Sequence, residues 1–112
     1  MSKISIGDSL PQTSLAILDV AGPVAHLTMR RDDVFNALNP QLIDDITQLL
    51  EWTRDRSVAE QGSLTDGSGA PFLRVVVLTG AGRHFCAGAD IDWMRASGAQ
   101  SAEENRADAA RL

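Results

Sequence analysis

The strongest constraint on the fold is an apolar run at residues 73–79, LRVVVLT. Its residues are mostly β-branched, and apolar side chains fall on both faces of an extended chain, which is typical of a strand buried on both sides. Gly80 and Gly82 interrupt the pattern directly after it. Since helical patterns lie on either side of the run, the sequence predicts an α/β fold in which this buried strand leads into a glycine-rich turn.

Two further apolar-rich stretches, at residues 15–20 and 24–29, precede this strand. Gly22 and Pro23 lie in the short gap between them, and such a gap between β-prone stretches predicts a hairpin. Pro23 has no N–H to donate to a ladder, so we place it at the start of the second strand.

A helix is predicted to follow, starting at Asn39 and Pro40. Asn is a good N-cap, and Pro fits the first helical position because its missing N–H is no loss there. The apolar residues that come next have helical spacing and form one stripe. They are Leu42, Ile43, Ile46, Leu49 and Leu50. We interpret Asp44 and Asp45 as acids that favour the helix start.

Two segments have the composition of loops. Residues 1–14 are polar and are expected to form a loose leader ahead of a domain at residues 15–112. Residues 57–72 are rich in Gly and Ser and contain Pro71, which predicts a flexible surface loop.

Helical patterns resume after the glycine-rich turn. One begins at about Asp90, and another at Ser101, where Glu104 completes a start similar to a capping box. No Gly or Pro stop signal follows the last pattern, so we expect this chain to be the first part of a larger domain.

Composition excludes several classes of function. A chain of 112 residues with 44% hydrophobic and 22% charged residues matches one small globular domain. Its net charge of −5 argues against nucleic acid as a partner. No apolar run approaches the roughly 18 residues of a membrane span, and no signal peptide is recognisable, so the cytoplasm is the expected location. With Cys86 as its one cysteine and two histidines, the sequence predicts neither an internal disulfide nor a metal site.

Residues 80–91 form the most informative segment for chemistry. A dinucleotide fingerprint would need a third glycine where Phe85 stands, and no phosphate-binding P-loop sequence occurs. Small residues run from Cys86 to Ala89, just before the helical pattern at Asp90. Backbone N–H groups at such a junction are unpaired and can bind an anion. Such N–H groups could serve as the donors of an oxyanion hole. A tight turn closing on the sheet is the alternative.

Two blocks of the sequence resemble the enoyl-CoA hydratase/isomerase (crotonase) family. Residues 31–39, RDDVFNALN, resemble its Arg-Pro-x-x-x-Asn-Ala-Leu segment. Residues 76–80, VVLTG, followed by residues 85–91, FCAGADI, resemble its strand and first oxyanion-hole loop. The resemblance covers roughly residues 15–112, and DWM at residues 92–94 further resembles the methylglutaconyl-CoA hydratase type.

The resemblance implies the N-terminal part of a crotonase-like spiral of ββα turns. Members bind acyl-CoA thioesters, usually as homotrimers or hexamers, and two backbone N–H groups hold the thioester oxygen while an enolate forms. By position, Ala89 would contribute the first of these N–H groups. No separate cofactor is implied, because coenzyme A arrives as part of the substrate. The residues implied to line the coenzyme A site are Val34, Ala37, Ala87, Asp90 and Ile91. The arginines available for its phosphates are Arg30, Arg31, Arg83 and Arg95, and solvation at the surface is the alternative favoured for most of them.

The sequence also departs from the family pattern. Asp32 stands where the family has Pro, which affects the entry to the first CoA-binding loop. The family's second oxyanion donor and its acidic catalytic residues lie downstream, with no counterpart here. We therefore expect an acyl-CoA-binding part of a hydratase (lyase) or isomerase of fatty acid or branched-chain catabolism that is inactive alone. The alternative is a non-catalytic remnant or interaction module of the same fold.

Other side chains have simpler interpretations. Cys86 and His84 lie two residues apart on a turn and would point apart, so a packed thiol is favoured over a nucleophile. Trp93 and Met94 could close over an acyl chain or pack against the preceding strand.

Overall fold

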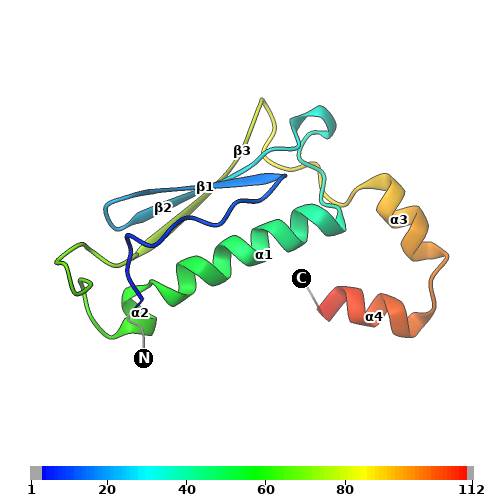
Figure 1. The fold of residues 1–112 in the computed structure, drawn as a ribbon. Helices are drawn as coiled ribbons and strands as arrows, with labels where there is room; N and C mark the ends of the chain where they lie inside the picture. The colour runs from blue at the N-terminus through cyan, green and yellow to red at the C-terminus, as the bar shows by residue number, and fades with distance from the viewer. Residues whose placement is uncertain (1–3, 111–112) are drawn as a thin grey trace.

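The computed structural model describes residues 4–110 of the chain (Figure 1). It consists of a three-stranded sheet and four α-helices. The strands are β1 (Ala16–Ala21), β2 (Val24–Met29) and β3 (Val75–Gly80). The helices are α1 (Pro40–Asp55), α2 (Val58–Gln61), α3 (Ile91–Gly98) and α4 (Ala102–Ala110), with a 3₁₀ turn η1 at Asp32–Val34. The predicted hairpin, central helix, later strand and two last helices are all confirmed.

The sheet has the order β1-β2-β3, with β1 antiparallel and β3 parallel to β2. Gly22 turns the hairpin with a φ of 56°, a left-handed conformation that glycine adopts without a steric cost. The carbonyl of Pro23 accepts the N–H of Arg74 at 2.8 Å, so the hairpin turn also fixes where β3 enters the sheet.

The core lies between the hairpin and α1, which runs along one side of the sheet in Figure 1. Burial alternates along β1 and β2, as expected for strands with one covered face. The fully or almost fully buried residues of this cluster are Ala16, Leu18, Ala25, Leu27, Met29, Leu42, Leu49 and Leu73. Each buried leucine contributes about 1.5–3 kcal/mol to folding.

Helix α1 begins as its sequence predicts. The side-chain oxygen of Asn39 accepts the N–H of Leu42 at 2.9 Å, and Pro40 occupies the first helical position. Asp45 differs from the interpretation given above, because the first turn of α1 contains no acidic residue. Its carboxylate is buried and accepts the N–H of Leu15 at 2.8 Å and the amide of Gln41 at 2.7 Å. Asp45 therefore anchors the chain at the entry to β1.

Strand β3 is confirmed as a strand, but its predicted burial on both faces is wrong. The residues from Val75 to Leu78 are 36–51% exposed, although β3 pairs with β2 along its whole length. The reason is its place at the edge of the sheet, with α1 packed against β1 and β2 instead. Helices α3 and α4 have no buried residue either.

Both segments expected to be loops make ordered contacts. Residues 57–72 contain α2 and a turn around the buried Asp66, whose carboxylate accepts the N–H groups of Ser68 and Ala70 at 2.8 and 3.0 Å. The hydroxyl of Ser68, above all, holds the pKa of Asp66 far below its usual value. Residues 4–14 form no helix or strand, and Ile6 and Leu10 pack against the core. Residues 1–3 of the expected leader lie outside the described residues.

None of the helices formed by residues 4–110 is long and apolar enough to cross a membrane.

Candidate functional site

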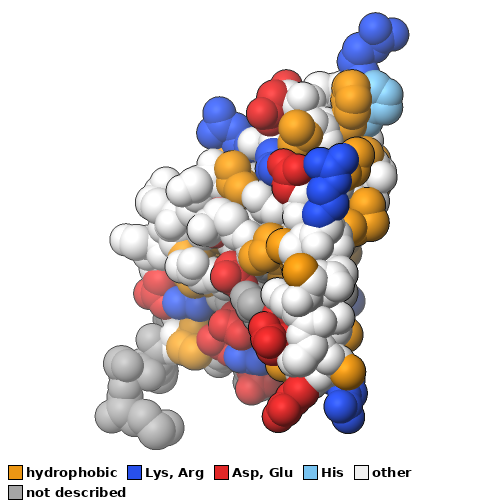
Figure 2. Space-filling model, turned by 90° about the vertical axis from the view of Figure 1, so that its right-hand side faces the viewer, with side chains coloured by type: hydrophobic (Ala, Val, Ile, Leu, Met, Phe, Trp, Pro, Cys, Tyr) orange, Lys and Arg blue, Asp and Glu red, His pale blue; other side chains and the backbone are white. Residues whose placement is uncertain are grey.

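An open cavity of about 530 Å³ lies where the segment after β2 meets the segment before α3. It is lined by Asp33, Val34, Phe35, Ala37, Ala87, Ala89, Asp90, Ile91, Asp92 and Arg95. All six residues that the sequence predicted for the site are among them, so the two sequence blocks meet in space. Figure 2 views the molecule from the side of α3 and shows apolar, acidic and basic side chains intermingled on the upper part of this face.

Ala89 is held in a parallel bridge to Leu38. The N–H of Leu38 donates to the carbonyl of Gly88, and the N–H of Asp90 donates to the carbonyl of Leu38, both at 2.7 Å. Because successive backbone groups of an extended chain alternate in direction, the N–H of Ala89 faces away from Leu38. It donates to no acceptor within residues 4–110. The cavity is thus bordered by an unpaired backbone donor at the position that the sequence predicted.

Asp90 uses both carboxylate oxygens. One oxygen accepts the N–H of Trp93 at 3.0 Å and caps α3, and the other binds Nη2 of Arg31 at 2.8 Å. Nη1 of Arg31 also donates to the carbonyl of Ala37 at 2.7 Å. The N–H of Trp93, and then the Arg31 guanidinium, hold the pKa of Asp90 below its usual value. Arg31 is therefore engaged in the fold and not free for coenzyme A phosphates.

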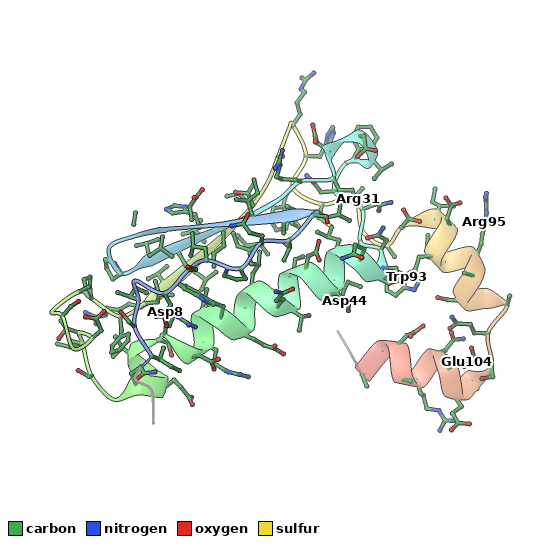
Figure 3. All side chains as sticks on the ribbon, in the orientation of Figure 1. Asp8, Arg31, Asp44, Trp93, Arg95 and Glu104 are labelled. Carbon is green, nitrogen blue, oxygen red and sulfur yellow. The ribbon has the colours of Figure 1, made fainter. Side chains whose placement is uncertain are left out.

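The other arginines proposed for phosphate binding are exposed. Figure 3 shows Arg31 beside the chain segment that leads to α3, whereas Arg95 projects outward from that helix. The ion pair of Arg95 with Asp92 is long, at 3.7 Å, and both side chains are solvated.

Asn36 supports the site without lining the cavity, and sequence reasoning missed this role. It is fully buried and has a φ of 56°, a left-handed conformation that Asn tolerates better than most residues. Its side-chain oxygen accepts the N–H of Arg31 at 2.9 Å, and its amide donates to the carbonyls of Ala81 and His84 at 2.9 and 2.8 Å. Asn36 thus connects the first block to the glycine-rich turn. Its presence in the resembling motif was the signal that could have identified it.

Gly80 permits this connection. A Cβ atom on Gly80 would lie 2.7 Å from Nδ2 of Asn36 and 2.8 Å from the carbonyl oxygen of His84. Such distances are shorter than real Cβ contacts. Only glycine therefore allows the end of β3 to approach Asn36 this closely.

The side chains considered above for nucleophilic or acyl-binding roles pack against neighbouring residues or are exposed. Cys86 is half-buried against the core, and its sulfur accepts the N–H of Gly88 at 3.4 Å. The ring of His84 packs edge-on against Phe35, with 4.7 Å between the ring centroids. Trp93 is half-buried, while Met94 is 53% exposed. No group of three or more His, Cys, Asp or Glu residues between positions 4 and 110 could hold a metal ion.

Known proteins are similar to this chain in sequence. Residues 19–111 match the family described as enoyl-CoA hydratase/isomerase. The chain is 39% identical over 75 residues to an (E)-benzylidenesuccinyl-CoA hydratase of Thauera aromatica, covering 66% of this chain and 24% of the relative. It is 40% identical over 80 residues to a probable enoyl-CoA hydratase of Mycobacterium leprae, covering 70% of this chain and 22% of the relative.

Solved structures support the fold. An enoyl-CoA hydratase from Shewanella pealeana superimposes with a TM-score of 0.71 at 27% identity, covering 89% of this chain and 32% of that one. A second structure, described as an enoyl-CoA hydratase/isomerase (crotonase) from Legionella pneumophila, gives a TM-score of 0.68 at 29% identity. That match covers 89% of this chain and 33% of the Legionella chain. The expected crotonase-like α/β fold is confirmed. This chain spans about a third of these structures and less than a quarter of the curated relatives.

Proposed function

Because this chain belongs to the enoyl-CoA hydratase/isomerase family, we propose that it forms the acyl-CoA-binding part of such an enzyme and provides its first oxyanion donor. The expected reaction is the addition of water across the 2,3-double bond of an enoyl-CoA through an enolate. The observation that carries the proposal is the unpaired N–H of Ala89 at the border of the cavity.

An N–H group in this position suits enolate chemistry. The thioester oxygen gains negative charge only as the enolate forms, so a fixed donor stabilises the transition state more than the bound substrate. The two backbone bonds to Leu38 hold Ala89 in place before the substrate arrives. Such a donor needs little reorganisation during the reaction.

The rest of the lining suits an acyl-CoA. Val34, Ala37, Ala87 and Ile91 line the cavity with small or apolar side chains, which would suit the pantetheine arm. The exposed Arg30, Arg83 and Arg95 are candidates for the phosphates, and no cofactor beyond coenzyme A itself is invoked. A cytoplasmic location and assembly into trimers or hexamers belong to the same proposal.

We expect the 112-residue chain to bind without catalysing. The family's second oxyanion donor and acid–base residues have no match in this sequence, and loss of one such donor alone lowers rates by about 10²–10³. The loss of enoyl-CoA absorbance, followed with the purified chain, should therefore stay at the uncatalysed rate. Robust turnover would contradict this part of the proposal.

Binding of the thioester tests the donor itself. Ala89→Pro removes the N–H without breaking a hydrogen bond within residues 4–110. We expect calorimetry to show about 3- to 10-fold weaker binding of an acyl-CoA, the worth of one hydrogen bond. Ala89→Gly keeps the N–H and is the matched control.

Free coenzyme A separates the donor from general damage to the site, because it has no thioester carbonyl. Its affinity should be the same in the wild type, Ala89→Pro and Ala89→Gly. Equal acyl-CoA affinity in the wild type and Ala89→Pro would contradict the proposal.

The second candidate function is a non-catalytic interaction module of the same fold, which the exposed apolar side chains of β3 favour. An absence of acyl-CoA binding by the wild type would support this alternative.

A further inference from the structure

We propose that Arg31 is a positioning residue that holds the N–H of Ala89 toward the cavity by clamping Ala37 and Asp90 together. This inference rests on the proposed function, since it assigns a task to the same donor. The clamp consists of the contacts from Nη1 of Arg31 to the Ala37 carbonyl at 2.7 Å and from Nη2 to the Asp90 carboxylate at 2.8 Å.

The clamp is placed directly beside the donor. Ala37 precedes Leu38, and Asp90 follows Ala89, so the guanidinium grips the residues adjacent to both partners of the Leu38–Ala89 bridge. This bridge lies outside the main sheet and has two backbone hydrogen bonds. The two charge-assisted contacts of Arg31 to Ala37 and Asp90 therefore contribute strongly to keeping Leu38 and Ala89 paired.

The surroundings of the pair keep these contacts strong. The side chains of Arg31 and Asp90 are only 18% and 12% exposed, so water and salt screen them less than a surface pair. The backbone N–H of Arg31 is in turn held by Asn36 at 2.9 Å. The backbone of Arg31 is thus held by Asn36, and its guanidinium is held by Ala37 and Asp90.

The geometry requires an arginine. Its planar fork presents separate N–H groups to a carbonyl and a carboxylate at once, whereas a lysine offers one compact ammonium group. Arg31→Lys keeps the charge but loses the fork, and Arg31→Gln loses both. Asp90→Asn removes the charge opposite Arg31 while its side-chain oxygen can still cap α3 through the Trp93 N–H.

The test uses the affinity ratio between an acyl-CoA and free coenzyme A, which we call the thioester increment. Calorimetry on the full 112-residue chain should give an increment about 3- to 10-fold smaller in Arg31→Gln and Asp90→Asn than in the wild type. The double variant should lose no more than either single one, because both changes remove the same clamp. Arg31→Lys should fall between the wild type and Arg31→Gln.

Free coenzyme A provides the readout that separates positioning from folding, and its affinity should be unchanged in Arg31→Gln and Arg31→Lys. Asp90 itself lines the cavity, so the affinity of Asp90→Asn for free coenzyme A is measured only to normalise its increment. Arg54→Gln is the matched control, because Arg54 also pairs with an aspartate, Asp55, but far from the cavity on an exposed part of α1. Its increment should equal that of the wild type.

The outcomes are distinguishable. A wild type without a thioester increment overturns the proposed function and this inference with it. An increment that is lost in Ala89→Pro but intact in Arg31→Gln and Asp90→Asn overturns this inference alone. Additive losses in the double variant, or a parallel loss of free coenzyme A affinity in Arg31→Gln, also overturn it.

Discussion

The two sides of the sheet's central strand differ in how completely their apolar side chains are covered. On the β1 side, the hairpin and α1 bury Leu18, Leu27 and Leu42 to 3% exposure or less. On the β3 side, Val75 to Leu78 are equally apolar and yet at least 36% exposed. Helices α3 and α4 follow β3 and bury no residue. The apolar character of a strand therefore shows that its side chains can be buried. Whether they are buried depends on which elements pack against the strand.

The candidate site lies at the junction of these two regions. Its first wall follows β2, and its second comprises the segment before α3 and the first residues of that helix. Asn36, the Leu38–Ala89 bridge and the Arg31–Asp90 pair join the two walls by hydrogen bonds in place of apolar packing. We infer that the geometry of the donor depends on polar contacts more than on the hydrophobic core.

The largest expected effect contrasts the two sides directly. Leu27→Ala should lower the free energy of unfolding by about 2–5 kcal/mol, because Leu27 is fully buried and its removal leaves a cavity. Val77→Ala should cost about 1 kcal/mol or less, because Val77 is already 36% exposed. Urea unfolding measures both. Equal losses would show that β3 is covered as well as β2.

The second prediction concerns the junction. Asn36→Gly should cost about 1–3 kcal/mol of unfolding free energy, because it leaves the carbonyls of Ala81 and His84 without their donor. Asn36→Ala should cost roughly 1–2 kcal/mol more, since alanine is strained at a φ of 56°. If alanine were tolerated as well as glycine, the left-handed conformation of Asn36 would be wrong.

The smallest expected effect compares the Arg31–Asp90 ion pair at the junction with the Arg56–Asp8 pair elsewhere in the fold. The pKa of Asp90 is lowered by the Trp93 N–H and by Arg31, and that of Asp8 by the Ser5 N–H and by Arg56. A carboxyl whose pKa is lower in the folded state stabilises the protein above about pH 4, its unfolded pKa, and loses that stabilisation as the pH falls through the folded value.

Urea midpoints from neutral pH to about pH 2 test this expectation. The difference in unfolding free energy between the wild type and Asp90→Asn should be largest above about pH 4 and should decrease as the pH falls. Asp8→Asn should show a smaller difference, because the side chain of Asp8 is 41% exposed and that of Asp90 is 12% exposed. A difference that grows toward acid would contradict the assignment.

The features predicted correctly from the sequence are those set by neighbouring residues. Asn39 caps α1, and the hydroxyl of Ser101 accepts the Glu104 N–H at 3.1 Å. Each of these contacts joins residues three apart, so the local pattern contains the whole cause. Resemblance to a family supplied the site residues, and the structure brings all six to one cavity.

The features that escaped prediction depend on distant residues. The exposure of β3 follows from its edge position and from where α1 packs. Two of the three bonds of Asn36, and the pairing of Arg31 with Asp90, join the segment before α1 to the segment after β3. No periodicity or composition encodes such contacts, and so the sequence offers Arg31 only as one of four arginines available for phosphates.

The chemical shift of the Ala89 amide proton tests the central claim most directly. In a ¹⁵N-labelled sample of the chain, this signal should move downfield on saturation with an acyl-CoA, because its N–H gains a carbonyl acceptor. Free coenzyme A should leave it nearly in place. An Ala89 signal that responds alike to both ligands, or to neither, would contradict the assignment of this N–H as the oxyanion donor.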